Sequence, residues 1–199
     1  MNYPTKESFL KDVENHKIIV HRDDGVYRHI ELTSGSFNMR YEIVTFPSTL
    51  VYTGDMGTFV FERTEDMFRF FRSREGTLEI NSRYWGEKCV ADDIHGGMRE
   101  WDTEGFRENV KYIVASQLDL EPEDIELTEE VIEEYKLEEM LAADGEHECI
   151  SALLDYSGKL EMADFFDGFT GHRKTYRFIW CLYAIVWAIQ QYDKYKEDE

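Results

Sequence analysis

A chain of 199 residues with 42% hydrophobic and 15% aromatic residues can bury a core, so its composition excludes a disordered protein. The formal net charge is −20, and residues 1–100 hold 13 basic against 17 acidic residues, whereas residues 101–199 hold 9 against 25. An acidic surface repels phosphate backbones, which disfavours ordinary nucleic-acid binding, so we expect no direct nucleic-acid contact and instead partners with a basic surface.

Three features of the chain bear on its location. The opening segment MNYPTKESFLKDVENHK is polar and mixed in charge, unlike a secretion signal. The longest apolar run, residues 178–189, is shorter than the roughly 18 to 20 residues that cross a bilayer and indicates a buried helix. Cys89, Cys149 and Cys181 are far apart and lack metal-ligand spacing, as is usual for thiols in a reducing compartment. We therefore expect a cytoplasmic protein that does not contact membranes.

Residues 17–63 have the pattern of an antiparallel β-meander. Short stretches rich in β-branched and aromatic residues alternate there with turn signals. The stretches are KIIVHR (17–22), VYRHIEL (26–32), FNMRYEIVTF (37–46), TLVYTG (49–54) and TFVFER (58–63). We expect four or five strands, with Phe37, Met39, Tyr41 and Ile43 on the covered face of the third.

Helical periods dominate after residue 63. Thr64 is placed to cap a short helix whose Met67, Phe70 and Phe71 lie on one face. No linker separates the later segments, so we expect a single α+β domain over residues 1–199, with a sheet-rich half (1–79) and an acidic helical half (80–199). The further helices are expected over roughly 81–92, 103–118, 128–143, 146–157 and 172–195.

The segment HRDDGVYRHI, residues 21–30, contains the first candidate site. A two-residue turn at Asp24-Gly25 would place its two histidines on opposite faces of a hairpin. A three-residue loop over residues 23–25 places His21, Tyr27 and His29 on one face, and we favour it because it separates apolar from polar residues more cleanly. The resulting patch is either a metal or acid/base site or a set of cross-strand pairs on a solvated face. The lack of tight ligand spacing favours the second interpretation.

Asp55, in the segment GDMG, is a further candidate. A carboxylate between two glycines can serve as a catalytic group or ligand on an exposed loop, but the same residues are typical of a hairpin turn. The segment is no phosphate cradle, because it lacks the lysine and hydroxyl of a P-loop. His21, His29 and Asp55 are therefore weak catalytic candidates, and we expect no metal and no cofactor.

Residues 119–139 carry eleven acidic residues and one lysine. As a helix this segment turns Leu127, Val131 and Tyr135 inward and its glutamates outward. Such a face is either a solvated surface or an imitation of a row of phosphates that occupies the basic groove of a partner. The candidate partner-binding residues are Glu126, Glu129, Glu130, Glu133 and Glu134.

The terminal helix carries an apolar stripe at helical spacing. We interpret this stripe as core or as the seam of a homo-oligomer rather than as a cofactor site. Its members are Tyr176, Ile179, Trp180, Tyr183, Trp187 and Gln190.

Part of the chain resembles a family of uncharacterised proteins encoded by phages and prophages. The residues that carry the likeness are HRDDGVYRH, TGDMGTFVFERTEDMFRFF and INSRYWGEK, against a family pattern H-x-D-G-V-Y-R-H, W-P-G and Y-T-G-D-M-G. The likeness extends from the N-terminus to around Val110, and Phe46-Pro47-Ser48 stands where the family has Trp-Pro-Gly. The resemblance implies a phage source and a host bacterial cytoplasm, and it implies no known chemistry.

These observations lead us to expect a phage-encoded, non-enzymatic inhibitor of a bacterial defence system, similar in action to an anti-CRISPR protein. It would bind a host defence protein or nucleoprotein complex through its acidic face. Two alternatives stay open. One is a small metal-dependent enzyme or ligand-binding protein that uses His21, Tyr27, His29 and Asp55, and the other is a structural or assembly protein of the virion.

Overall fold

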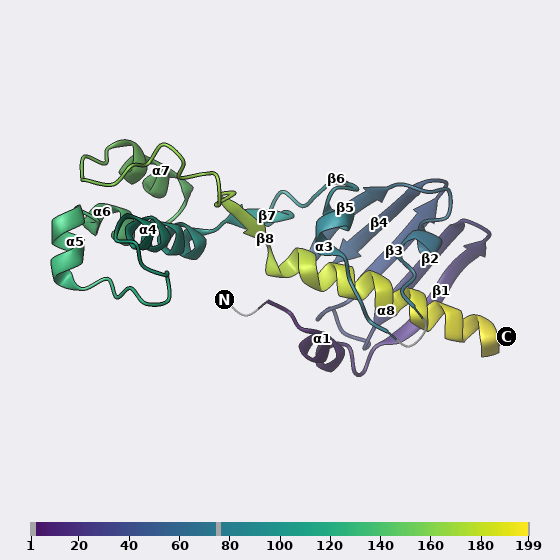
Figure 1. Cartoon of the computed structure of the whole chain (residues 1–199). Helices are drawn as coiled ribbons and strands as arrows, with labels where there is room; N and C mark the ends of the chain where they lie inside the picture. The colour runs from purple at the N-terminus through teal and green to yellow at the C-terminus, as the bar shows by residue number, and fades with distance from the viewer. Residues whose placement is uncertain (1–2, 75–76, 199) are drawn as a thin grey trace. The chain divides into compact units, whose positions relative to one another are not determined.

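The computed structural model describes residues 3–74 and 77–198, and the chain divides into two compact units. Unit 1 comprises Met1–Arg99 and Lys174–Glu199, and unit 2 comprises Glu100–Arg173. The predicted fold class is confirmed: the protein is α+β, with an N-terminal antiparallel meander and a largely helical second half (Figure 1). The units differ from the expected halves 1–79 and 80–199, because the last helix returns to the sheet of unit 1.

The sheet of unit 1 has six strands in the order in which they occur along the chain, and every neighbouring pair is antiparallel. One strand more than expected is present, because residues 89–91 pair with the fifth strand in a segment where we expected a helix over 81–92. The helix there, α3, is confined to Ser82–Gly86. The strands are β1 (Lys17–Asp24), β2 (Tyr27–Thr33), β3 (Tyr41–Phe46), β4 (Thr49–Gly54), β5 (Gly57–Glu62) and β6 (Cys89–Ala91).

One face of this sheet is covered by helix α8 (Tyr176–Asp198), which runs across it in Figure 1. Alternate residues of the strands turn inward and are fully buried, as the period of two requires, among them Ile30, Leu32 and Ile43. The hydroxyl of Tyr41 donates a hydrogen bond to the carbonyl oxygen of Ala184 at 3.2 Å, which ties β3 to the helix. The apolar run 178–189 is therefore core, as predicted, and no helix in the described part of the chain is long and apolar enough to cross a membrane.

Two short helices complete unit 1. Helix α1 (Lys6–Asp12), which the sequence did not predict, buries Phe9 against the ring of Trp180. Helix α2 (Met67–Phe71) is capped by Asp66, whose carboxylate accepts from the backbone of the first turn, and not by Thr64 as expected. Both helices pack their apolar residues into the same core as α8.

The third strand starts later than predicted. Met39 adopts a left-handed backbone conformation (φ 55°), and the amide of Arg40 donates to the carbonyl oxygen of Phe37 across a turn. The strand therefore begins at Tyr41, and Phe37 is 85% exposed instead of covered.

Unit 2 is mainly helical and has its own small core. Helix α4 (Thr103–Gln117) buries Phe106, Val110 and Val114. The helix expected over 128–143 is broken, because Lys136 takes a left-handed conformation (φ 54°) and ends the first part. The two parts are α5 (Glu129–Tyr135) and α6 (Glu138–Ala142), and the next helix is α7 (Glu146–Leu154). Strands β7 (Arg99–Trp101) and β8 (His172–Lys174) pair with each other, and β8 replaces the expected start of the terminal helix.

Candidate functional site

The hairpin of β1 and β2 does not have the predicted turn. Asp24 pairs with Tyr27, so the turn consists of Gly25 and Val26, and the three-residue loop over 23–25 is wrong. Gly25 has φ 61°, which suits the first central position of a type II′ turn. A β-bulge interrupts the pairing between Val20 and Arg22.

The bulge brings the two predicted histidines together. His21 is the extra residue, so His21 and Arg22 both lie opposite His29. The ring centroids of His21 and His29 are 4.6 Å apart. Tyr27 precedes His29 by two positions on the same face of β2, with the guanidinium of Arg22 5.1 Å from its ring centre. The shared face that we expected therefore exists, but the bulge produces it rather than the loop.

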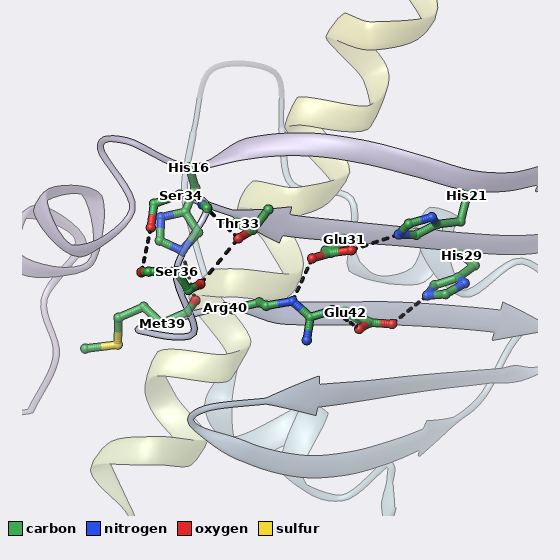
Figure 2. A network of polar contacts seen from close by, with 11 residues as sticks. His16, His21, His29, Glu31, Thr33, Ser34, Ser36, Met39, Arg40 and Glu42 are labelled. Atoms are coloured by element: carbon green, nitrogen blue, oxygen red, sulfur yellow. Dashed lines mark hydrogen bonds and ion pairs between the residues drawn. The ribbon is translucent and has the colours of Figure 1, made fainter.

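The two histidines belong to a chain of polar contacts that Figure 2 shows. His21 Nε2 lies 2.9 Å from Glu31 Oε2, and His29 Nε2 lies 2.6 Å from Glu42 Oε2. Arg40 links the two histidine–glutamate pairs, because its Nε donates to Glu31 and its Nη2 donates to Glu42. Glu31 and Glu42 face each other across β2 and β3, and like charges in that position are destabilising. Arg40 donates to both carboxylates and so reduces their mutual repulsion.

The pKa values of the two carboxylates respond to these contacts. Hydrogen bonds from Arg40 and His21 lower the pKa of Glu31. The hydrogen bond with His29, followed by the charge of Arg40, lowers the pKa of Glu42. Both carboxylates are therefore ionised near neutral pH and act as acceptors rather than as acids. The geometry is that of a surface whose carboxylates are held by partners within the protein.

The structure does not bring Asp55 to the histidines. Its Oδ2 accepts from the amide of Met39 at 2.9 Å, and its own amide donates to the carbonyl oxygen of Arg40 at 3.0 Å. Asp55 thus fastens the β4–β5 turn to the segment that precedes β3. Within residues 3–74 and 77–198, no group of three or more His, Cys, Asp or Glu side chains is arranged to hold a metal ion.

The cysteines are not placed as nucleophiles. Burial raises the pKa of Cys89 to about 11, and burial likewise raises the pKa of Cys181. Cys149 is fully buried. A thiol reacts as its thiolate, so the raised pKa values disfavour Cys89 and Cys181 as nucleophiles near neutral pH.

The acidity of the protein is concentrated in unit 2. Its span, Glu100–Arg173, contains 22 of the 42 acidic residues of the chain and 5 of the 22 basic ones, which gives a formal charge of −17. Unit 1 accounts for the remaining −3, although it is the longer of the two units. The boundary of the acidic region is therefore sharper than the sequence halves suggested.

Helix α5 presents four of the five predicted glutamates. Its N-cap, Thr128, accepts from the amide of Val131, and Tyr135 turns into the core of unit 2. Glu126 precedes the cap and is not part of the helix. Glu134 forms an ion pair with Lys159 at 2.9 Å, and such an exposed pair contributes little to stability. All five predicted glutamates are exposed: Glu126, Glu129, Glu130, Glu133 and Glu134.

Sequence reasoning did not single out Glu31, Arg40 or Glu42 as partners of the histidines. Arg40 and Glu42 alternate with apolar residues, which marks them as lying on the uncovered face of the sheet. Their contact with His21 and His29 depends on the strand register, which includes the bulge in β1.

The fold and its surface define an α+β protein with a charge-balanced sheet unit and a strongly acidic helical unit. Comparisons with family models, with curated proteins and with solved structures found no match for the chain. Function is therefore inferred from the chemistry of the surface.

Proposed function

We propose that this protein is a non-enzymatic inhibitor that binds a basic surface of a nucleic-acid-handling protein through the outer face of α5. The observation that carries the proposal is the concentration of a charge of −17 in unit 2, between Glu100 and Arg173. A negative surface is complementary to the basic clefts in which other proteins bind nucleic acid. Bound there, it would compete with the nucleic acid.

The charge density of α5 supports this function. The helix carries four glutamates in seven residues, a length of about 10 Å at 1.5 Å per residue, or about one carboxylate per 2.6 Å. Without Glu134, which pairs with Lys159, the spacing is about 3.5 Å. Double-stranded DNA carries about one charge per 1.7 Å of axis, and each of its strands about one per 3.4 Å. The charge spacing along α5 is therefore similar to that of the nucleic acid with which it would compete.

The class of target is inferred from the resemblance of the N-terminal segments to phage and prophage proteins. A protein made by a phage in the host cytoplasm meets bacterial defence complexes that hold nucleic acid in basic channels. We therefore place the target among these defence proteins and nucleoprotein complexes.

The test is a pull-down with the tagged full-length protein from bacterial lysates that each express one defined defence complex, washed at low and at high salt. We expect stoichiometric capture of one complex at low salt, loss of that complex at high salt, and loss of its nucleic-acid binding when this protein is added. Electrostatic contacts weaken with ionic strength, which explains the expected salt effect.

The matched variant for this experiment is Glu129→Lys/Glu130→Lys/Glu133→Lys. These side chains are exposed, so the variant is expected to fold, which circular dichroism checks. Capture that is unchanged by the triple reversal, or no captured complex at either salt concentration, would contradict the proposed function.

A further inference from the structure

Unit 2 contains a groove of about 650 Å³ to which α5 contributes no residue. One wall is the exposed side of α4, and the other walls are the segment after α4 and the loop before β8. The residues that matter for its chemistry are Glu108, Lys111 and Tyr112 on α4, together with Glu123 and Phe169.

The groove combines aromatic surface with negative charge. Tyr112 is 57% exposed, whereas Phe169 is 7% exposed and packs against Phe106. Glu108 and Glu123 are exposed, and within the described residues neither carboxylate takes part in an ion pair or a hydrogen bond. Two carboxylates without a direct ion-pair or hydrogen-bond partner, in a groove that also holds an exposed aromatic ring, form an environment that a cation prefers.

Lys111 is the one basic residue among the described residues that line the groove. It lies three positions after Glu108 on α4, at the spacing of neighbouring side chains on a helix. Lys111 therefore offsets part of the negative charge and competes with an external cation.

We propose that this groove receives an arginine side chain of a basic protein partner. The inference rests on the proposed function and adds a second contact point, separate from α5. The aliphatic part of the arginine lies against Tyr112 and Phe169, and its guanidinium is placed between Glu108 and Glu123. Arginine fits better than lysine, because its planar group stacks on aromatic rings and donates to two carboxylates at once.

The test uses the full-length protein, labelled with ¹⁵N and titrated at low salt with an acetylated hexa-arginine peptide. The largest chemical-shift changes in the groove are expected at the amides of Tyr112, Glu123 and Phe169. Hexa-lysine is expected to bind there about threefold more weakly, because it lacks the stacking contribution.

Variants sharpen the assignment. Glu108→Gln/Glu123→Gln is expected to weaken binding at the groove about tenfold, and Tyr112→Ala about threefold. Lys111→Ala is expected to strengthen binding about threefold, because it removes the internal competitor. Glu14→Gln/Glu62→Gln, at exposed positions of unit 1, carries the same change in net charge as the first variant and should leave the shifts in the groove unchanged.

The outcomes separate the inference from the proposed function. Shift changes confined to α5, or a groove response that is equal for the two double glutamine variants, would overturn the arginine groove and leave the acidic inhibitor standing. No binding of either peptide at low salt would overturn both. Groove binding that weakens in Glu108→Gln/Glu123→Gln and persists in Glu14→Gln/Glu62→Gln supports the inference.

Discussion

The two units of this protein use charge in opposite ways. Unit 1 contains 20 acidic and 17 basic residues. Several of them form ion pairs, such as Arg28 with Asp66 at 2.9 Å and Arg72 with Asp193 at 2.7 Å. In unit 2, 22 acidic residues share 5 basic ones, so basic partners are too few for most of the carboxylates. Paired charges stabilise the fold, whereas an excess of one sign opposes compaction through self-repulsion. The proposed function gives this excess a role in binding a partner.

The few basic residues of unit 2 illustrate the difference. Arg173 Nε donates to Glu100 at 2.9 Å and Nη1 donates to Asp102 at 3.2 Å. Arg107 donates to the carbonyl oxygens of Leu141 and Ala143, which ties α4 to the end of α6. Two of the five basic side chains thus hold the unit together rather than neutralising its outer face.

The largest expected effect concerns the independence of the two cores. Phe106→Ala and Phe178→Ala each remove a fully buried ring and should lower the free energy of unfolding by about 3 to 5 kcal/mol. We expect each variant to destabilise its own unit, as measured by hydrogen exchange of residues in both units. Equal loss of protection across the whole chain in both variants would show that the units unfold as one.

Salt should affect the two units differently. Raising the ionic strength screens the repulsion among the carboxylates of unit 2, while the paired charges of unit 1 gain nothing. We expect unit 2 to gain several degrees in melting temperature between low and high salt. The indole N–H resonance of Trp101, the one tryptophan of unit 2, reports this melting in ¹⁵N-labelled protein. A melting temperature of unit 2 that does not change with salt would contradict the proposed difference between the two units.

Arg40→Met should expose the role of balanced charge in unit 1. The folded pKa values of Glu31 and Glu42 are lowered, so their contribution to stability is present above the ordinary carboxyl pKa of about 4.3 and is lost as pH falls through the lowered values. The variant should melt a few degrees below the wild type at pH 8, and the gap should close as the pH falls below the ordinary carboxyl range. A gap that widens in acid would contradict this account.

The smallest effect is expected at the hairpin turn. Gly25 has φ 61° and open space around its Cα, so Gly25→Ala adds backbone strain without a clash. We expect a loss of about 1 kcal/mol in the free energy of unfolding and no change in partner binding. Gly25→Asn, which tolerates this conformation better, should lose less; an equal loss in both variants would point to a cause other than backbone strain.

Some elements could be predicted because local signals enclose them. Strand β4 has the predicted bounds, Thr49–Gly54, since turn residues stand on both sides of it. The bulge at His21 could not be predicted, because a single extra residue leaves no mark on a period of two. The break at Lys136 was equally hidden, since a left-handed lysine carries none of the signals that a glycine would give.

Other features depend on contacts between distant segments. Strand β6 is three residues long and is defined by its pairing with β5 rather than by its own composition. The return of α8 to the first unit likewise follows from burial against the sheet, which periodicity within the helix does not reveal. The candidate glutamates of α5 were found from the sequence because charge and helical spacing are local properties.

The most direct test of the central claim is the dissociation constant of the captured complex, measured across a range of salt concentrations for the wild type and two triple variants. Glu129→Lys/Glu130→Lys/Glu133→Lys reverses the face of α5, and Glu14→Lys/Glu62→Lys/Glu65→Lys makes the same change in charge at exposed positions of unit 1. We predict that the first variant binds at least about tenfold more weakly with a smaller salt dependence, and that the second stays close to the wild type. Equal weakening in both variants, or none in either, would contradict the claim that the acidic face of unit 2 is the binding surface.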